Sequence, residues 1–206
     1  FGIAAVALTC LMGKGGSRAS MILSGIMMGS LFSALVSLVK FTADTESQLP
    51  AITYWLMGSL SAAGFAALKL GAPAILVSCA VLLLLRWKLN LLPLSDDEAR
   101  TFGTNMKRLR GLCIICCAAM TASCVAMCGQ VGWVGLLVPH VCRMIFGSSH
   151  ARLLPACISC GAVFMMVVDT LARTISAAEI PVSILTAIIG APIFIAIVRK
   201  KGGWGL

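Results

Sequence analysis

The sequence contains little charge, and acidic residues are especially scarce. Only 11% of its 206 residues are charged, and 7 Asp and Glu stand against 16 Lys and Arg. Soluble domains carry about a quarter of their residues as charged side chains. Because 60% of this chain is hydrophobic, one soluble core could not cover so much apolar surface. The composition excludes an ordinary soluble domain and indicates an integral membrane protein, with the lipid bilayer as its surroundings.

Several functional motifs are also missing. The sequence has no Gly-x-x-x-x-Gly-Lys-Ser/Thr loop, so any nucleotide chemistry must come from another chain. A membrane-embedded enzyme using His140 and Asp169 is an alternative, but no activated serine or metal cluster accompanies these two residues. An ion-coupled secondary transporter is another, although Asp169 is the only carboxylate well inside an apolar stretch. We therefore expect a protein without catalytic residues of its own.

The first apolar stretch, FGIAAVALTCLM, has neither a basic segment before it nor a small-residue cleavage site after it. A signal peptide is therefore not expected. We interpret the stretch as the end of a spanning helix, so that the chain would be a fragment of a longer protein.

Apolar blocks of about 20 residues, the length that crosses a bilayer as a helix, recur along the chain. The expected spanning helices cover residues 21–41, 64–85, 109–129, 133–146, 152–174 and 181–198. The block 133–146 is short and contains Pro139, which removes a backbone donor, so we expect a broken or displaced helix there. The stretch 51–60 is too short to span and predicts a partly inserted or surface helix. The fold expected for residues 1–206 is one all-α, polytopic transmembrane bundle with about six spanning helices.

The basic residues predict the orientation of this bundle. If the polar loop 86–110 faces the cytoplasm, 13 of the 16 Lys and Arg residues lie on that side. Lys40 and Lys69 then lie outside, and Arg173 lies near the outer end of a span. The net charge of +9 is explained by topology, so we expect no nucleic-acid partner.

Most of the ten cysteines lie inside apolar stretches, where they act as small apolar side chains. Two pairs, Cys113-x-x-Cys116 and Cys157-x-x-Cys160, have the spacing of metal ligands. Because a thiolate cluster in lipid is costly and no histidine lies beside these pairs, we expect neither a metal nor a cofactor.

The loop 86–110 contains signals for two short helices. Ser95 can cap a helix whose first turn holds Asp96, Asp97 and Glu98, and acids stabilise the positive end of a helix. Gly103 offers a stop, and Thr104 or Asn105 can start a second helix that continues into 107–110. An ordinary solvated loop is the alternative.

Small residues recur every fourth position in the block 21–41, at Gly25, Gly29, Ser33 and Ser37. They form a groove that allows close approach of a neighbouring helix or of a substrate path, and both interpretations stay open.

Arg173 follows Asp169 by four residues, so the two side chains can pair along one helix face. His140 is expected to be a polar residue inside the bundle. His150 and Arg152 are expected on the cytoplasmic side, in solvent or against a partner.

Four polar motifs resemble, in the same order, those of one permease family. They are LNLLPLSDDEARTFGTNMKRLR (89–110), GWVGLLVPH (132–140) with Arg143, GSSHARLLP (147–155), and AEIPV (178–182) followed by Thr186 and Gly190-Ala-Pro192. The sequence resembles the FecCD/BtuC type of ABC importer permease, which imports iron–siderophore complexes, haem or vitamin B12. The resemblance covers nearly the whole chain.

The resemblance implies a multi-pass protein of the bacterial cytoplasmic (inner) membrane that acts with other chains. The implied partners are cytoplasmic ATPase subunits, an extracytoplasmic substrate-binding protein, and a second permease, identical or paralogous. It places the cytoplasmic coupling segment at 88–108, and the implied ATPase-coupling residues are Ser95, Asp96, Asp97, Glu98, Arg100, Thr101 and Gly103. It gives Arg173 a role in docking the binding protein, beside the local pair with Asp169.

Overall fold

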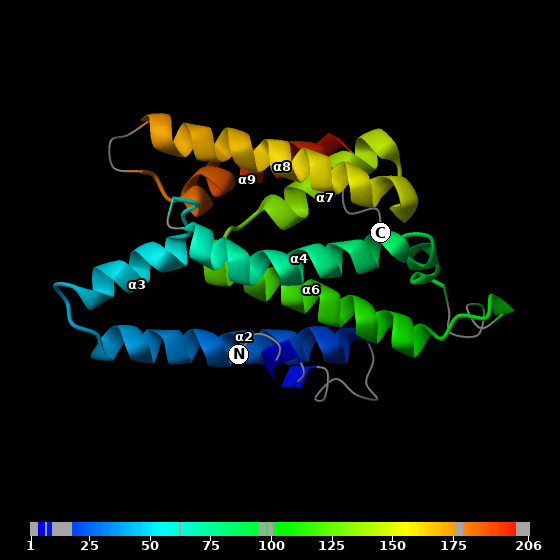
Figure 1. The fold of residues 1–206 in the computed structure, drawn as a ribbon, viewed down its shortest axis with the longest axis horizontal. Helices are drawn as coiled ribbons and strands as arrows, with labels where there is room; N and C mark the ends of the chain where they lie inside the picture. Colours follow the sequence, from blue (N-terminus) through cyan, green and yellow to red (C-terminus); the bar gives the residue numbers. More distant parts are fainter. Residues whose placement is uncertain are drawn as a thin grey trace.

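The computed structural model describes residues 4–6, 8–9, 18–61, 63–94, 98, 101–175 and 179–200. In this part of the chain the regular elements are all helices (Figure 1). They are α2 (Arg18–Thr42), α3 (Gln48–Met57), α4 (Phe65–Leu84), the 3₁₀ helix η1 (Lys88–Leu91), α6 (Met106–Cys128), α7 (Val134–Phe146), α8 (His150–Ile175) and α9 (Val182–Lys200). The expectation of an all-α fold is confirmed.

Each of the six apolar blocks forms one helix. Four helices are long and apolar enough to cross a membrane: α2 from Ile22, α4, α6 and α8. The apolar parts of α7 and α9 are shorter, at Val134–Phe146 and Val182–Ile197. The stretch predicted to be too short to span is the ten-residue helix α3. The hydrophobic pattern therefore locates every one of these helices.

A broken or displaced helix was one expectation at Pro139, and the break is wrong, because α7 is continuous from Val134 to Phe146 with the proline inside it. The displacement stays a prediction. Pro139 is the sixth residue of α7, close to the helix start, where few backbone hydrogen bonds precede it.

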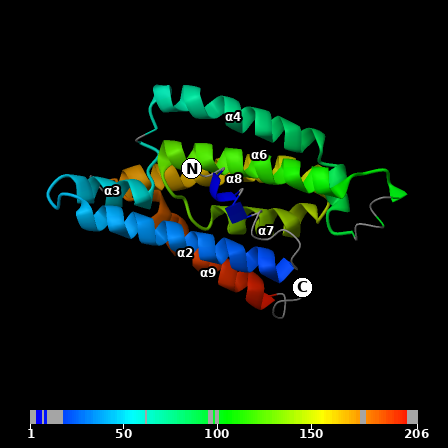
Figure 2. The ribbon, with the colours of Figure 1, turned by 90° about the horizontal axis from the view of Figure 1, so that it is seen from below.

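The helices pack in two groups. α4 packs along α6, and α7, α8 and α9 pack on one another, with α3 touching α9 and α4 touching α8 (Figures 1 and 2). The second group holds a well-packed cluster in which Val168 and Val182 are 0% and 2% exposed. Helix α2 instead exposes most of its apolar side chains, such as Ile22 and Leu38. Exposed apolar surface of this kind is what lipid or a neighbouring apolar helix covers.

α3 and η1 lie at opposite ends of the bundle (Figure 1). In the orientation predicted from the basic residues, the end with η1 and the start of α6 is cytoplasmic. The ends of α2 and α6, helix α3 and the start of α9 then lie at the outer side. The two ends carry the two candidate sites.

Candidate functional site

The base of the segment 88–108 is anchored by apolar contacts. Leu89 of η1 is 6% exposed and packs with Met106 and Leu109, at the start of α6. Leu154 of α8 packs against the same cluster. Because η1, α6 and α8 share this cluster and Leu85, just after α4, packs against it, a displacement of η1 would be transmitted to these helices.

Asn90 joins η1 to α8 across 60 residues of sequence. Its Oδ1 accepts a hydrogen bond from the backbone N–H of His150 at 2.8 Å and lies 2.9 Å from His150 Nδ1. Asn90 thus satisfies an amide at the start of α8 that has no partner inside the helix. His150 was expected in solvent or against a partner; the structure places it half-buried and bonded to η1. Sequence reasoning missed this role of Asn90, which lies in the motif LNLLP.

Further along the segment, Thr101 Oγ1 donates a hydrogen bond to the Glu98 carbonyl oxygen at 2.6 Å. Gly103 has a φ of 66°, a left-handed conformation that suits glycine and ends a helix. Asn105 then caps α6, since its Oδ1 accepts from the backbone N–H of Arg108 at 3.2 Å. The expected helix start at 104–105 is confirmed, but the second helix is not short, because it is the beginning of α6, which continues to Cys128.

Four of the seven predicted coupling residues lie outside the described residues, namely Ser95, Asp96, Asp97 and Arg100. The capping role of Ser95 therefore stays a prediction. So does the role of Glu98, Thr101 and Gly103 in coupling.

Near the other end of the bundle, the predicted pair on α8 is present. Arg173 Nε donates to Asp169 Oδ2 at 2.9 Å, and the two side chains are 45% and 25% exposed. The pair is accessible, so Arg173 can contact a second protein while Asp169 holds it. Ile180, just before α9, donates its backbone N–H to the Ala172 carbonyl of α8 at 3.2 Å.

The predicted small-residue stripe lies on α2. A Cβ added at Gly25 or Gly29 would meet no heavy atom within 4 Å in the described part of the chain. Ser33 and Ser37 are exposed, and the Ser37 hydroxyl donates to the Ser33 carbonyl. The stripe therefore packs against no helix of this part, and its role as a substrate path stays a prediction.

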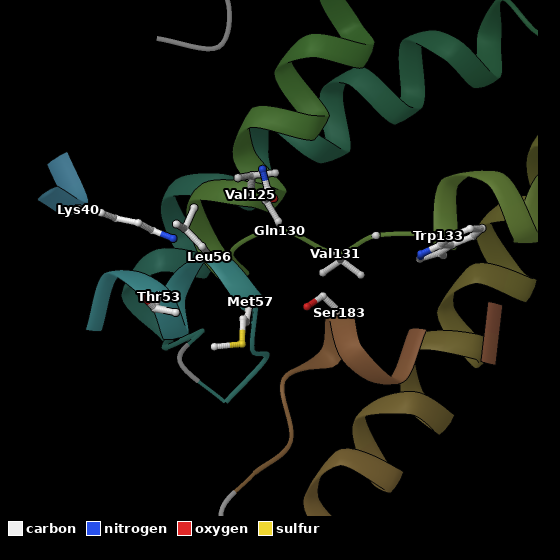
Figure 3. A pocket seen from close by; sticks show the side chains of 10 residues that line it. Lys40, Thr53, Leu56, Met57, Val125, Gln130, Val131, Trp133 and Ser183 are labelled. Carbon is white, nitrogen blue, oxygen red and sulfur yellow. The ribbon is translucent and has the colours of Figure 1, made fainter. Parts of the chain in front are cut away.

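A pocket of about 550 Å³ opens at the end predicted to face outward (Figure 3). Four helices and the connection between α6 and α7 contribute to it. Its lining residues are Lys40 of α2, Thr53, Leu56 and Met57 of α3, Val125 of α6, Gln130, Val131, Gly132 and Trp133 of the connection, and Ser183 of α9. No local sequence pattern predicts this pocket, because its lining residues come from five separate places in the chain.

Two glycines allow the walls of this pocket to meet. Gly58 and Gly129 both have a φ of 72°, after the ends of α3 and α6. A Cβ on Gly58 would collide with the Gln130 carbonyl, and one on Gly129 with the Trp55 carbonyl. The carbonyl of Gly58 also accepts from the Val182 N–H at 3.0 Å, which ties α9 to the same junction. Larger residues at either glycine would force the three helix ends apart.

Trp133 stands at the boundary between the pocket and α9. Its φ of 65° makes it the only non-glycine residue with a positive φ among those described, a strained state for a bulky side chain. Its ring packs edge-on against Phe194, with centroids 6.5 Å apart. A Cβ added at Gly190 would lie 3.0 Å from Trp133 Cβ, so Gly190 leaves the space that this tryptophan occupies.

His140 lies half-buried in α7, and its ring contacts Phe194 edge-on at 5.3 Å. Over the residues that the structure describes, no three His, Cys, Asp or Glu side chains are grouped as metal ligands. The nine cysteines among them are free thiols. This part of the molecule provides no set of ligands for a metal.

A sequence model of the FecCD transport family matches residues 1–200. The molybdate import system permease MolB of Haemophilus influenzae is 46% identical over 185 residues, which is 89% of this chain and 55% of that protein. The Fe(3+)-citrate import system permease YfmE of Bacillus subtilis is 39% identical over 183 residues, 87% of this chain and 54% of that protein. This chain thus spans about half the length of these relatives.

A solved structure described as an inward-facing conformation of a metal-chelate type ABC transporter superposes on this chain with a TM-score of 0.92. The two chains are 44% identical, and the alignment covers 96% of this chain and 64% of the solved one. The arrangement of helices described above therefore matches that of a chain in this solved structure.

Proposed function

Because the chain belongs to the FecCD transport family, we propose that it is membrane-spanning permease machinery of an ATP-binding cassette importer. It provides the path across the cytoplasmic membrane of a bacterium, and a separate ATPase provides the energy. The observation that carries this proposal is the match of residues 1–200 to one transport family. Relatives named as permeases favour transport over the membrane-embedded enzyme.

The ATPase contacts the segment 88–108 in this proposal. A coupling element must be stiff and must be tied to the helices that it moves. The apolar anchor of Leu89 and the two contacts between Asn90 and His150 support that requirement. The coupling residues of the segment remain those predicted from the sequence, including Thr101 and Gly103.

At the outer end, an extracytoplasmic binding protein docks on Arg173 and delivers the cargo. The exposed guanidinium, held by Asp169, suits a carboxylate on that partner. A second permease, identical or paralogous, completes the membrane part, and the exposed apolar surface of α2 is available to it or to the cargo path. The path includes Gly25, Gly29, Ser33 and Ser37.

The cargo is a metal complex or a metal oxyanion. Relatives are named for molybdate, ferric citrate, hemin and cobalamin, and these four are candidates. The iron–siderophore complexes expected from the sequence are a further candidate.

Uptake in proteoliposomes tests the proposal. The full-length permease is reconstituted with the ATPase and binding protein of the same operon, and ATP-dependent accumulation of molybdate, ferric citrate, hemin and cobalamin is measured. We expect accumulation of one cargo class that needs both ATP and the binding protein. Uptake driven by an ion gradient without ATP would overturn the proposal in favour of a secondary transporter.

A further inference from the structure

The lining of the pocket at the outer end is rich in side-chain hydrogen-bond donors and has no acidic residue. Of its ten lining residues, five carry side-chain hydrogen-bond donors, and none is Asp or Glu. The donors are the Lys40 ammonium, the Thr53 and Ser183 hydroxyls, the Gln130 amide and the Trp133 indole N–H. In Figure 3 the Ser183 hydroxyl points toward Met57 of α3, the Trp133 indole nitrogen lies on the side of its ring nearer Val131, and the Lys40 nitrogen lies beside Leu56.

Within the described part of the chain, these donor groups form no ion pair or side-chain hydrogen bond. The one ion pair described there joins Arg173 to Asp169, so no carboxylate of that part neutralises Lys40. The hydroxyls of Thr53 and Ser183 and the side-chain nitrogens of Gln130 and Trp133 likewise make no hydrogen bond within it. The pocket therefore presents one full positive charge and several free donors to whatever enters it.

The helix ends around the pocket favour the same sign of ligand. Ser183 lies in the first turn of the 19-residue helix α9, and the N-terminus of a helix carries a partial positive charge. The C-terminal ends of α3 and α6 also reach the pocket, and some of their last carbonyls already accept hydrogen bonds. Trp55 O accepts from Gly58 N, and Val125 O accepts from Gly129 N. Lys40 contributes a full positive charge, whereas each helix end contributes about half a charge, so the net sign around the pocket is positive.

We propose that this pocket binds an anionic, oxygen-rich group of the cargo, with Lys40 as the principal charge. Its volume of about 550 Å³ accommodates a tetrahedral oxyanion or a small carboxylate chelate, within the usual range of ligand pockets. This proposal rests on the proposed transport function, because it makes the pocket a binding site along the path of the cargo through the membrane. It narrows the cargo to free oxyanions or anionic chelates, and it disfavours a neutral cargo.

Equilibrium dialysis tests the proposal on the full-length permease in lipid nanodiscs, without the binding protein. Radiolabelled molybdate represents a free oxyanion, and radiolabelled ferric citrate represents an anionic chelate. The variants are Lys40→Met, which removes the charge, and Lys40→Arg, which keeps it. Lys69→Met is the matched control, because Lys69 is exposed near the start of α4 and does not line the pocket.

We expect saturable binding of at least one probe, weakened about tenfold or more by Lys40→Met, since a hydrogen bond to a charged group is lost. Lys40→Arg and Lys69→Met should bind within about twofold of the wild type. The probe that binds identifies the source of the anionic group. Equal affinity in Lys40→Met, or no saturable binding of either probe, would overturn the proposal.

The two proposals fail in different ways. Equilibrium dialysis does not depend on ATP hydrolysis, so it measures only the affinity of the pocket for the probe. If Lys40-dependent binding is found but the binding protein does not stimulate the ATPase, the transport function is contradicted and the anion site stands. If ATP-dependent uptake of molybdate or ferric citrate is normal in Lys40→Met, the anion site is contradicted and the transport function stands.

Discussion

Asn90 and His150 are held together by two contacts, from the Asn90 Oδ1 to the backbone nitrogen of His150 at 2.8 Å and to its Nδ1 at 2.9 Å. One oxygen of η1 therefore fixes both the start of α8 and the histidine ring at that start. α8 runs from this contact to the exposed Asp169–Arg173 pair. A single helix thus connects the predicted ATPase side with the predicted docking side.

Removing the Asn90 side chain should weaken coupling. Asn90→Ala leaves the amide of His150 without its partner, and loss of a comparable cap costs about 1 kcal/mol. We expect more ATP hydrolysed per cargo molecule accumulated in proteoliposomes. Asn90→Asp keeps the acceptor and serves as the control. If Asn90→Ala hydrolyses as much ATP per accumulated cargo molecule as the wild type, the contact between Asn90 and His150 does not contribute to coupling.

Gly103 should tolerate no bulky residue. Its φ of 66° is strained for other residues, at about 1 kcal/mol or more, so Gly103→Val should deform the end of the coupling segment. We expect ATP hydrolysis to continue while uptake falls. Gly111→Ala is the control, since a Cβ there meets open space within α6. Unaltered coupling in Gly103→Val would remove this glycine from the mechanism.

Charge reversal at Arg173 should weaken docking of the binding protein. Arg173→Glu replaces the guanidinium with a charge that repels both Asp169 and an acidic partner. Affinity measured by surface plasmon resonance should fall about tenfold or more. Asp169→Asn breaks the internal pair but keeps Arg173, and should have the smaller effect. If Arg173→Glu binds as tightly as the wild type, the residue is only a partner for Asp169.

The junction at Gly58 should be intolerant of any side chain. Gly58→Ala places a Cβ against the Gln130 carbonyl at a positive φ, so we expect about 2 kcal/mol or more of lost stability. A fall in melting temperature in detergent measures it. Gly25→Ala is the matched control, because a Cβ there meets nothing within 4 Å and alanine favours helix. An equal melting temperature for the two variants would contradict the tight junction.

The helices could be predicted from the sequence because their limits are local signals. Apolar blocks end at charged, proline or glycine residues, so the predicted bounds lie close to the observed ones. The expected block 21–41 corresponds to α2 (Arg18–Thr42), and the block 133–146 corresponds to α7 (Val134–Phe146). The Asp169–Arg173 pair could be predicted as well, since four residues make one helical turn.

Contacts between distant residues could not be predicted in this way. Asn90 and His150 are 60 positions apart, and η1 has too few residues to show a periodic pattern. The pocket gathers Lys40, Gln130 and Ser183 from three parts of the chain, and only the packing of helix ends brings them together. Pro139 misled the prediction because its effect depends on its position within the helix.

Site-specific photo-crosslinking tests most directly whether the segment 88–108 is the surface driven by the ATPase. A benzophenone amino acid is placed at Thr101, or at Phe65 at the opposite end of the bundle as the control, in the assembled full-length transporter. We predict a crosslink to the ATPase subunit from Thr101 and none from Phe65. A crosslink from Thr101 to the extracytoplasmic binding protein, or from Phe65 to the ATPase, would contradict the orientation and the coupling role together.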